Sequence, residues 1–260
     1  RMTFDFYQKR TSNLLFAVPI SGVIGVTSIW QNIGELTNTG FETTLSADII
    51  KNKDLTWTFD ANLSTNTNKI KKLYSGRDQI IEGDGIAGST NTLLRPGLSA
   101  DTYYLREWAG VDPDTGAPQW LTTDANGDRV ITKNYAKADQ VALDTRATPN
   151  VFGSFSPTLM YKGFDLNAVF GYSLGAYIYN YSRQEYDSDG ADTDRNQLSL
   201  QKGWKRWKQK GDIATHPVAA YNNPSNANKA STRYLESADF LKLRSVTLGY
   251  NFNLKSQIVK

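Results

Sequence analysis

The sequence predicts an all-β fold, namely a segment of an antiparallel transmembrane β-barrel with long extracellular loops. Three observations favour this fold class. Apolar and polar side chains alternate with a period of two, the alternating runs exceed the usual ~5–6 residues of a strand, and short connections alternate with very long ones. The 260-residue chain is only 39% hydrophobic but 12% aromatic, a composition that provides little aliphatic core and many amphipathic rings.

The first three expected strands lie at residues 2–9, 33–50 and 54–66. The third carries the clearest pattern, because every odd position from Leu55 to Leu63 is apolar and every even position from Thr56 to Ser64 is polar. Residues 2–9 and 33–50 show weaker copies of it. A strand of this kind has one apolar face and one polar face.

The other three expected strands lie at residues 150–162, 163–180 and 232–252. The second of these is unusually long, since all even positions from Phe164 to Ile178 are apolar. In the last strand, Leu243 falls in the opposite phase to Val246. The alternation therefore changes sides there, by a bulge or because the strand leaves the buried zone.

The connections alternate in length. Residues 50–54 and 162–163 form short links, whereas residues 66–150 and 181–231 form long loops. The first long loop contains a predicted hairpin, residues 103–110 and 118–131, with Asp/Asn/Gly turns at 112–116 and 124–128. The second shows no period, and so long a connection without regular structure is unusual in a compact soluble domain.

One-sided apolar strands bury that side in a protein core or in lipid, and a sheet in lipid must close into a barrel. Strand length, loop asymmetry and the aromatic residues near the short turns favour lipid over a soluble sandwich or jelly roll. The polar faces, with Asp60, Asn62, Asp165 and Asn167, then line a wet or plugged lumen. No apolar run reaches the ~18 residues of a membrane helix.

About six membrane-length strands cannot close a wide barrel, since a large plugged transporter uses about 22 strands. The sequence also starts in mid-strand and ends in the polar residues 256–260. We therefore expect a segment of a longer polypeptide.

Four stretches resemble the SusC/RagA family of TonB-dependent outer-membrane transporters. They are Gln31-Asn32-Ile33-Gly34 leading to Asn38-Thr39-Gly40-Phe41-Glu42; Ala109 to Gly116; Arg206-Trp207 with Gly211-Asp212 and Pro217; and Tyr234 to Arg244. The resemblance places residues 1–260 in the C-terminal half of that family's barrel, short of the final strands and without the plug domain. Lys210 stands where the family pattern leads us to expect proline, which leaves the turn geometry open.

The resemblance implies import of oligosaccharides or peptides across the outer membrane, driven by TonB through a segment absent from this chain, with a SusD-like surface lipoprotein as partner. The remaining alternatives are a secreted all-β glycan-binding module and a passive porin. Membrane lipid is expected around the barrel. A net charge of +3 is too small to indicate nucleic acid as a partner.

No enzyme is expected. The chain has no Cys and one His, which excludes thiolate chemistry and His-rich metal cages, and we expect no cofactor. Residues 171–175 match a hydrolase nucleophile elbow, but Ser173 lies inside a predicted strand, whereas the elbow needs a strand-to-helix turn. His216 is expected at the surface.

Residues 187–194 carry four carboxylates, which favour a solvated acidic loop over a calcium site because the loop lacks a bidentate Glu.

Four aromatic residues are candidates for substrate binding: Trp204, Trp207, Tyr103 and Tyr104. The two Trp lie within residues 202–210 among five cationic side chains. This segment could anchor the loop at lipid headgroups, the alternative we favour, because Trp and Lys suit interfaces. Contact with a ligand and stacking on nucleic acid are the other two alternatives.

Overall fold

The computed structural model describes residues 1–19, 28–73, 78–82 and 92–252, with the backbone alone at 15–19 and 28–33. The predicted polar end at 256–260 lies outside the described residues. The chain divides into two units. The sheet unit comprises Arg1–Ser75, Thr148–Ala176 and Ala238–Lys260, and the loop unit comprises Gly76–Ala147 and Tyr177–Ser237.

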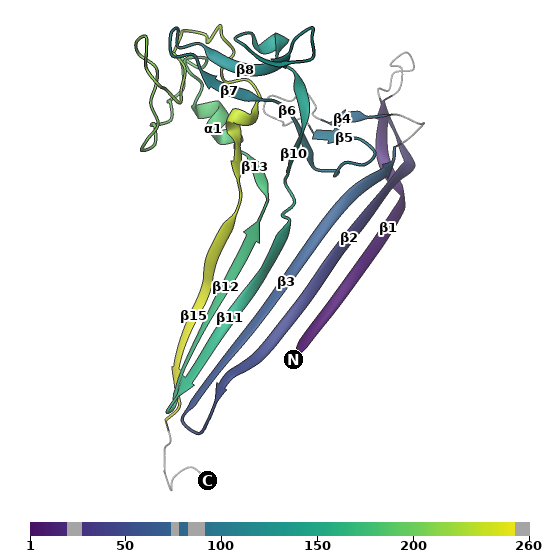
Figure 1. Ribbon diagram of the computed structural model, residues 1–260, viewed down its shortest axis with the longest axis vertical. Helices are drawn as coiled ribbons and strands as arrows, with labels where there is room; N and C mark the ends of the chain where they lie inside the picture. Colours follow the sequence, from purple (N-terminus) through teal and green to yellow (C-terminus); the bar gives the residue numbers. More distant parts are fainter. Residues whose placement is uncertain (20–27, 74–77, 83–91, 253–260) are drawn as a thin grey trace. The chain divides into compact units, whose positions relative to one another are not determined.

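The sheet unit is a six-stranded antiparallel sheet (Figure 1). Its strands, in spatial order, are β1 (Met2–Pro19), β2 (Ser28–Lys51), β3 (Leu55–Lys72), β11 (Val151–Tyr161), β12 (Phe164–Leu174) and β15 (Phe240–Tyr250). These strands overlap the six predicted ranges, and β1, β2 and β3 continue well beyond them. A barrel strand needs ~9–11 residues to cross a membrane, so the first three strands are long enough to extend past it.

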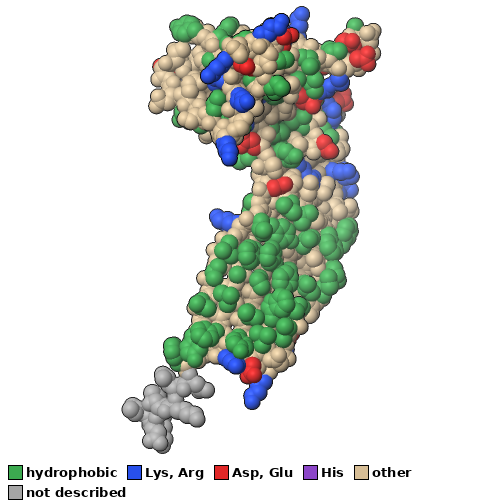
Figure 2. Space-filling model, turned by 60° about the vertical axis from the view of Figure 1, so that its left-hand side comes forward, with side chains coloured by type: hydrophobic (Ala, Val, Ile, Leu, Met, Phe, Trp, Pro, Cys, Tyr) green, Lys and Arg blue, Asp and Glu red, His purple; other side chains and the backbone are tan. Residues whose placement is uncertain are grey.

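The register gives the sheet one apolar and one polar face. Trp57, Leu159, Leu166 and Leu248 pair in one row across four strands and therefore share the apolar face. Figure 2 shows hydrophobic side chains gathered on the sheet. These side chains remain exposed, and the exposed fraction of Leu248 is 71%. An apolar surface of this kind is unfavourable in water.

The polar face is crosslinked by side-chain hydrogen bonds. Asn62 Nδ2 donates to Ser154 Oγ over 2.6 Å, and Asn167 Nδ2 donates to the hydroxyls of Ser156 and Thr158 over 2.8 and 2.7 Å. Asp60 accepts a hydrogen bond from a neighbouring serine on the same face. The residues predicted to line a lumen thus share one face and join neighbouring strands.

The strands are joined by tight turns at one end of the sheet. Lys162 and Gly163 both have positive φ, 45° and 91°, as a two-residue type I′ hairpin requires. In the other turn, Asn52 Oδ1 accepts hydrogen bonds from the backbone N–H groups of Asp54 and Leu55. Aromatic rings gather at this end, where the ring centroids of Phe164 and Tyr250 are 4.4 Å apart.

The change of phase in the last strand is a β-bulge, which confirms one of the two predicted explanations. Val169 pairs with Ser245 but Phe170 pairs with Leu243, so Arg244 has no partner in the register. The extra residue returns Leu243 to the apolar face.

Two predicted strands are shorter than expected. The strand predicted at 163–180 ends at Leu174, because Gly175 has φ +79° and its N–H donates to Asp239 Oδ1 over 2.5 Å. The strand predicted at 232–252 begins instead as a 3-10 turn, η4 (Thr232–Tyr234). The short strand β14 (Leu235–Ser237) follows and pairs with β13 (Tyr177–Tyr179).

The loop unit contains more sheet than the sequence indicated. The four strands β10 (Gln140–Arg146), β6 (Thr102–Arg106), β5 (Thr92–Leu94) and β4 (Ile80–Glu82) form one sheet. Three others form a second sheet: β7 (Trp108–Val111), β8 (Pro118–Thr123) and β9 (Arg129–Thr132). The segment predicted at 103–110 therefore divides between two sheets, whereas both predicted turns are present, closed by Asp112 N–H to Ala117 O and Asp124 N–H to Asp128 O.

The rest of the loop unit consists of short helices and turns. Besides η4 it contains η3 (Tyr135–Lys137) and α1 (Tyr181–Tyr186). Its hydrophobic cluster comprises Tyr103, Leu105, Tyr179 and Tyr234. In the part of the chain that the structure describes, no helix has the length and apolar character needed to cross a membrane.

Candidate functional site

The loop unit contains a group of charged residues that we call the ionic cluster: the buried Asp187, Asp189, His216 and Arg233, and the half-buried Arg206. Helix α1 has Asn180 as its N-cap, whose side chain accepts from Arg183 N–H over 2.9 Å, and Asp187 as its C-cap. The chain thereby turns both carboxylates inward.

Each carboxylate of the cluster binds two cationic or imidazole groups. Asp187 Oδ2 accepts from Arg233 Nη2 over 3.1 Å and lies 2.8 Å from His216 Nε2. Asp189 Oδ1 accepts from Arg206 Nη1 over 2.6 Å, and Asp189 Oδ2 accepts from Arg233. Asp187 and His216 are 1% exposed and Asp189 is fully buried.

The surroundings favour the charged forms of Asp187 and Arg233. Burial acts to raise the pKa of Asp187, but the hydrogen bond from His216 and the charge of Arg233 outweigh it, so this pKa lies below its ordinary value. Burial acts to lower the pKa of Arg233, and Tyr234 together with the two aspartates raises it instead. Both carboxylates are thus neutralised by side chains of the chain itself.

This arrangement changes two predictions. The run 187–194 is not simply a solvated acidic loop, because Asp187 and Asp189 are buried and bound to arginines. A cation would have to displace those arginines, and no group of three or more His, Cys, Asp or Glu suited to a metal occurs among the described residues. The prediction that His216 lies at the surface is wrong.

Trp204 packs on the cluster. Its ring lies 4.9 Å from the His216 ring and 4.5 Å from the Arg183 guanidinium. Arg183 also pairs with Glu236 over 2.8 Å. A ring held between imidazole and guanidinium has a fixed orientation, so Trp204 forms part of the framework of this loop.

Trp207 joins two turns. Its Nε1 donates to Pro113 O over 2.9 Å, and a side chain at Gly116 would overlap its ring. Within that turn, Asp112 pairs with Lys133 and accepts from Thr115 Oγ1 over 2.6 Å. The pairing with Lys133 and these hydrogen bonds lower the pKa of Asp112 to about 2.

Lys210 is compatible with the turn in which it lies. Gly211 has φ +93° and Asp212 N–H donates to Gln209 O over 3.1 Å, which fits a type II turn with Lys210 at its first central position. Proline is favoured there but not required. Asp212 Oδ2 accepts from the N–H groups of Lys208 and Gln209 and holds the turn closed.

Of the four predicted substrate-binding residues, Tyr103 is buried and the other three are half-buried. Tyr103 is 6% exposed and its hydroxyl donates to Tyr177 O over 3.0 Å, so it offers no free ring face. Tyr104 lies half-buried in β6, and Trp204 and Trp207 are half-buried as described. Substrate contact by these residues stays a prediction.

The sequence did carry one signal for the cluster. Arg206 belongs to one of the family-like stretches and Arg233 directly precedes another. The structure brings two of these stretches together in the loop unit, since Trp207 Nε1 donates to Pro113 O. It also places Arg206 and Arg233 on the same carboxylate, that of Asp189. Ser173 lies within β12, opposite Phe152, so residues 171–175 do not form a nucleophile elbow.

A sheet with long antiparallel strands, one exposed apolar face and a hydrogen-bonded polar face is the wall of a transmembrane β-barrel. No family model matches the chain. The chain is 30% identical over 96% of its length to TonB-dependent receptor P3 of Formosa agariphila and 27% identical over 95% to TonB-dependent receptor SusC of Bacteroides thetaiotaomicron.

Among solved structures, that of the RagAB peptide transporter matches 96% of the chain with a TM-score of 0.80 and 28% identity. The chain is thus a distant homologue, over nearly its whole length, of the SusC/RagA-type TonB-dependent receptors, which reside in the outer membrane. It spans about a quarter of the length of these relatives: 25% of P3, 24% of SusC and 26% of the RagAB chain.

Removing one charge from the ionic cluster should loosen the loop unit. Asp189→Asn leaves Arg233 buried with a single carboxylate partner, and breaking a buried pair costs about 3–5 kcal/mol. We expect proteolytic cleavage within residues 181–231 to accelerate by at least about 100-fold. The matched control is Asp194→Asn, an exposed carboxylate of the same run. Equal cleavage rates for the two variants would contradict the assignment.

The Asp112 turn should show an acid transition. Because the folded pKa of about 2 lies below the ordinary 3.8, the stability that this carboxylate contributes is complete above about pH 4 and is lost as the pH falls toward 2. Amide exchange across residues 112–117, corrected for its intrinsic pH dependence, should be slower in wild type than in Asp112→Asn at pH 6. The difference in exchange rate should vanish near pH 2. A difference that stays constant from pH 6 to pH 2 would refute the prediction.

Proposed function

We propose that the protein imports oligosaccharides or peptides across the outer membrane in a TonB-dependent manner, together with a SusD-like surface lipoprotein. The chain forms part of the barrel wall and some of the long loops that connect its strands. The observation that carries the proposal is the match to the RagAB peptide transporter over 96% of the chain, in sequence and in fold together.

The division of labour follows from the two units. The sheet unit has paired strands and regular faces, which suit a passive wall. The loop unit holds its irregular segments in place with the ionic cluster, which leaves other side chains free for recognition. We assign substrate capture to the loop unit, with Trp204 and Trp207 near its recognition surface.

The structure offers little support for the secreted glycan-binding module. Such a module would keep its large apolar side chains covered, whereas Phe6 is 74% exposed and Leu248 71% exposed. A surface of this kind in a soluble protein would drive association. The porin alternative shares the barrel and differs in its energy source.

Uptake measurements separate importer from porin. Cells carrying the intact protein should take up a labelled oligosaccharide or peptide mixture, and deletion of tonB should abolish that uptake. Deletion of the SusD-like lipoprotein should reduce uptake severalfold, because we expect this lipoprotein to retain substrate at the loops. Heat-modifiable migration of the protein in both strains confirms that the barrel is present. Uptake at the wild-type rate without TonB would refute the proposal and favour a porin.

A further inference from the structure

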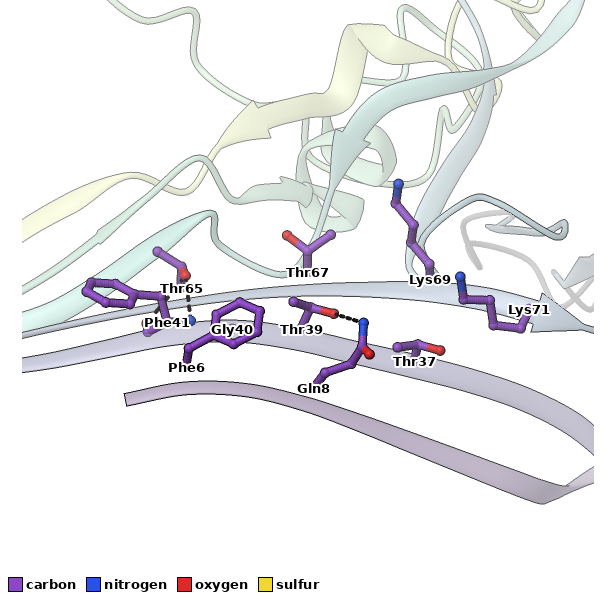
Figure 3. Close-up of a pocket in the computed structure, with 10 residues that line it drawn as sticks. All are labelled: Phe6, Gln8, Thr37, Thr39, Gly40, Phe41, Thr65, Thr67, Lys69 and Lys71. Atoms are coloured by element: carbon purple, nitrogen blue, oxygen red, sulfur yellow. Dashed lines mark hydrogen bonds between the residues drawn. The ribbon is translucent and has the colours of Figure 1, made fainter. Parts of the chain in front are cut away.

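A groove of about 470 Å³ lies on the sheet unit where the apolar face ends (Figure 3). It is formed by β1, β2 and β3 at the end remote from the short turns. Its lining residues include Phe6, Phe41, Thr39, Thr67, Lys69 and Lys71. The groove therefore belongs to the outer surface of the barrel wall.

The strand register orders these side chains by polarity along the groove. Phe6, Phe41 and Thr65 form one row. Gln8, Thr39 and Thr67 form the next, where Gln8 Nε2 donates to Thr39 Oγ1 over 3.4 Å.

Arg10, Thr37 and Lys69 form the third row. The surface thus changes from rings to hydroxyls to ammonium groups within three rows, all on the face that carries the apolar residues.

This gradient matches the depth of a membrane leaflet. Lys69 lies four residues beyond Thr65, and at ~3.4 Å per residue and ~45° tilt this corresponds to ~10 Å of height. A Lys side chain bends its ammonium several Å toward the interface. The two ammonium groups therefore reach the headgroup layer while the rings of Phe6 and Phe41 remain at acyl depth.

Lys69 and Lys71 are available for a ligand. Both side chains are exposed, and within the described ranges no carboxylate lies within 4 Å of either ammonium group. Arg10 is different, because it pairs with Glu35 over 2.7 Å. Two unpaired cations beside several hydroxyls complement a phosphate attached to a hydroxyl-rich headgroup.

We propose that this groove binds a phosphorylated lipid of the outer leaflet. Its acyl chain lies on Phe6 and Phe41, its headgroup hydroxyls meet Thr39 and Thr67, and its phosphate binds Lys69 and Lys71. The apolar rings beside the cations favour a lipid over a soluble phosphate, and the groove lies on the face opposite the polar face.

Native mass spectrometry of the intact protein in detergent tests this site. The probes are an acylated glucosamine disaccharide carrying phosphate and the same lipid with its phosphate removed. Lys69→Ser with Lys71→Ser should weaken binding of the phosphorylated lipid about tenfold or more and leave the dephosphorylated lipid unchanged. Phe6→Ser should weaken the binding of both lipids to the same extent.

The control is Lys53→Ser with Lys162→Ser, which removes the same charge at the short-turn end and should leave both affinities unchanged. Heat-modifiable migration verifies that each variant folds, and Lys69→Arg with Lys71→Arg should retain phosphorylated-lipid binding even if the Ser variant fails to fold. Wild-type affinity in the Ser variant, loss of affinity in the Arg variant, or an equal loss for the dephosphorylated lipid or for the control overturns the proposal.

Discussion

Two requirements act together on every strand of the sheet unit: backbone groups within lipid must be paired, and side chains facing lipid must be apolar. A strand satisfies both only when its neighbours hold a register that keeps like side chains in one row. The row from Trp57 to Leu248 shows this. The bulge at Arg244 has the same purpose. The extra residue shifts the alternation by one position, so that Leu243 and Val246 both lie on the apolar face.

The loop unit solves a different problem. Beside its hydrophobic cluster, paired charged groups hold its long segments in place. Such pairs add little net stability over an apolar core, but losing one partner is costly. Asp187 and Asp189 together bind Arg206, His216 and Arg233. The cluster thus specifies one arrangement of the loops.

The strands could be predicted from sequence because each carries its own period. The bulge at Arg244 also left a local mark, the reversed phase. The break at Gly175 did not, because the alternation continues past it. The short strands of the loop unit have too few residues to show a period, and the ionic cluster joins Asp187 to Arg233 across 46 residues of chain. Partners so distant leave no spacing that a single sequence reveals, which is why His216 was expected at the surface.

The central claim is that the apolar face meets acyl chains and the polar face does not. Residues 1–260 contain no Cys, so a single Cys can be placed in this segment at either of two adjacent positions, Leu248→Cys or Thr247→Cys, and spin-labelled in the reconstituted intact protein, with any Cys outside the segment replaced. The account predicts that a label at residue 248 collides with oxygen and is shielded from a water-soluble nickel reagent, and that a label at 247 shows the reverse. Equal access of the nickel reagent to both positions would contradict it.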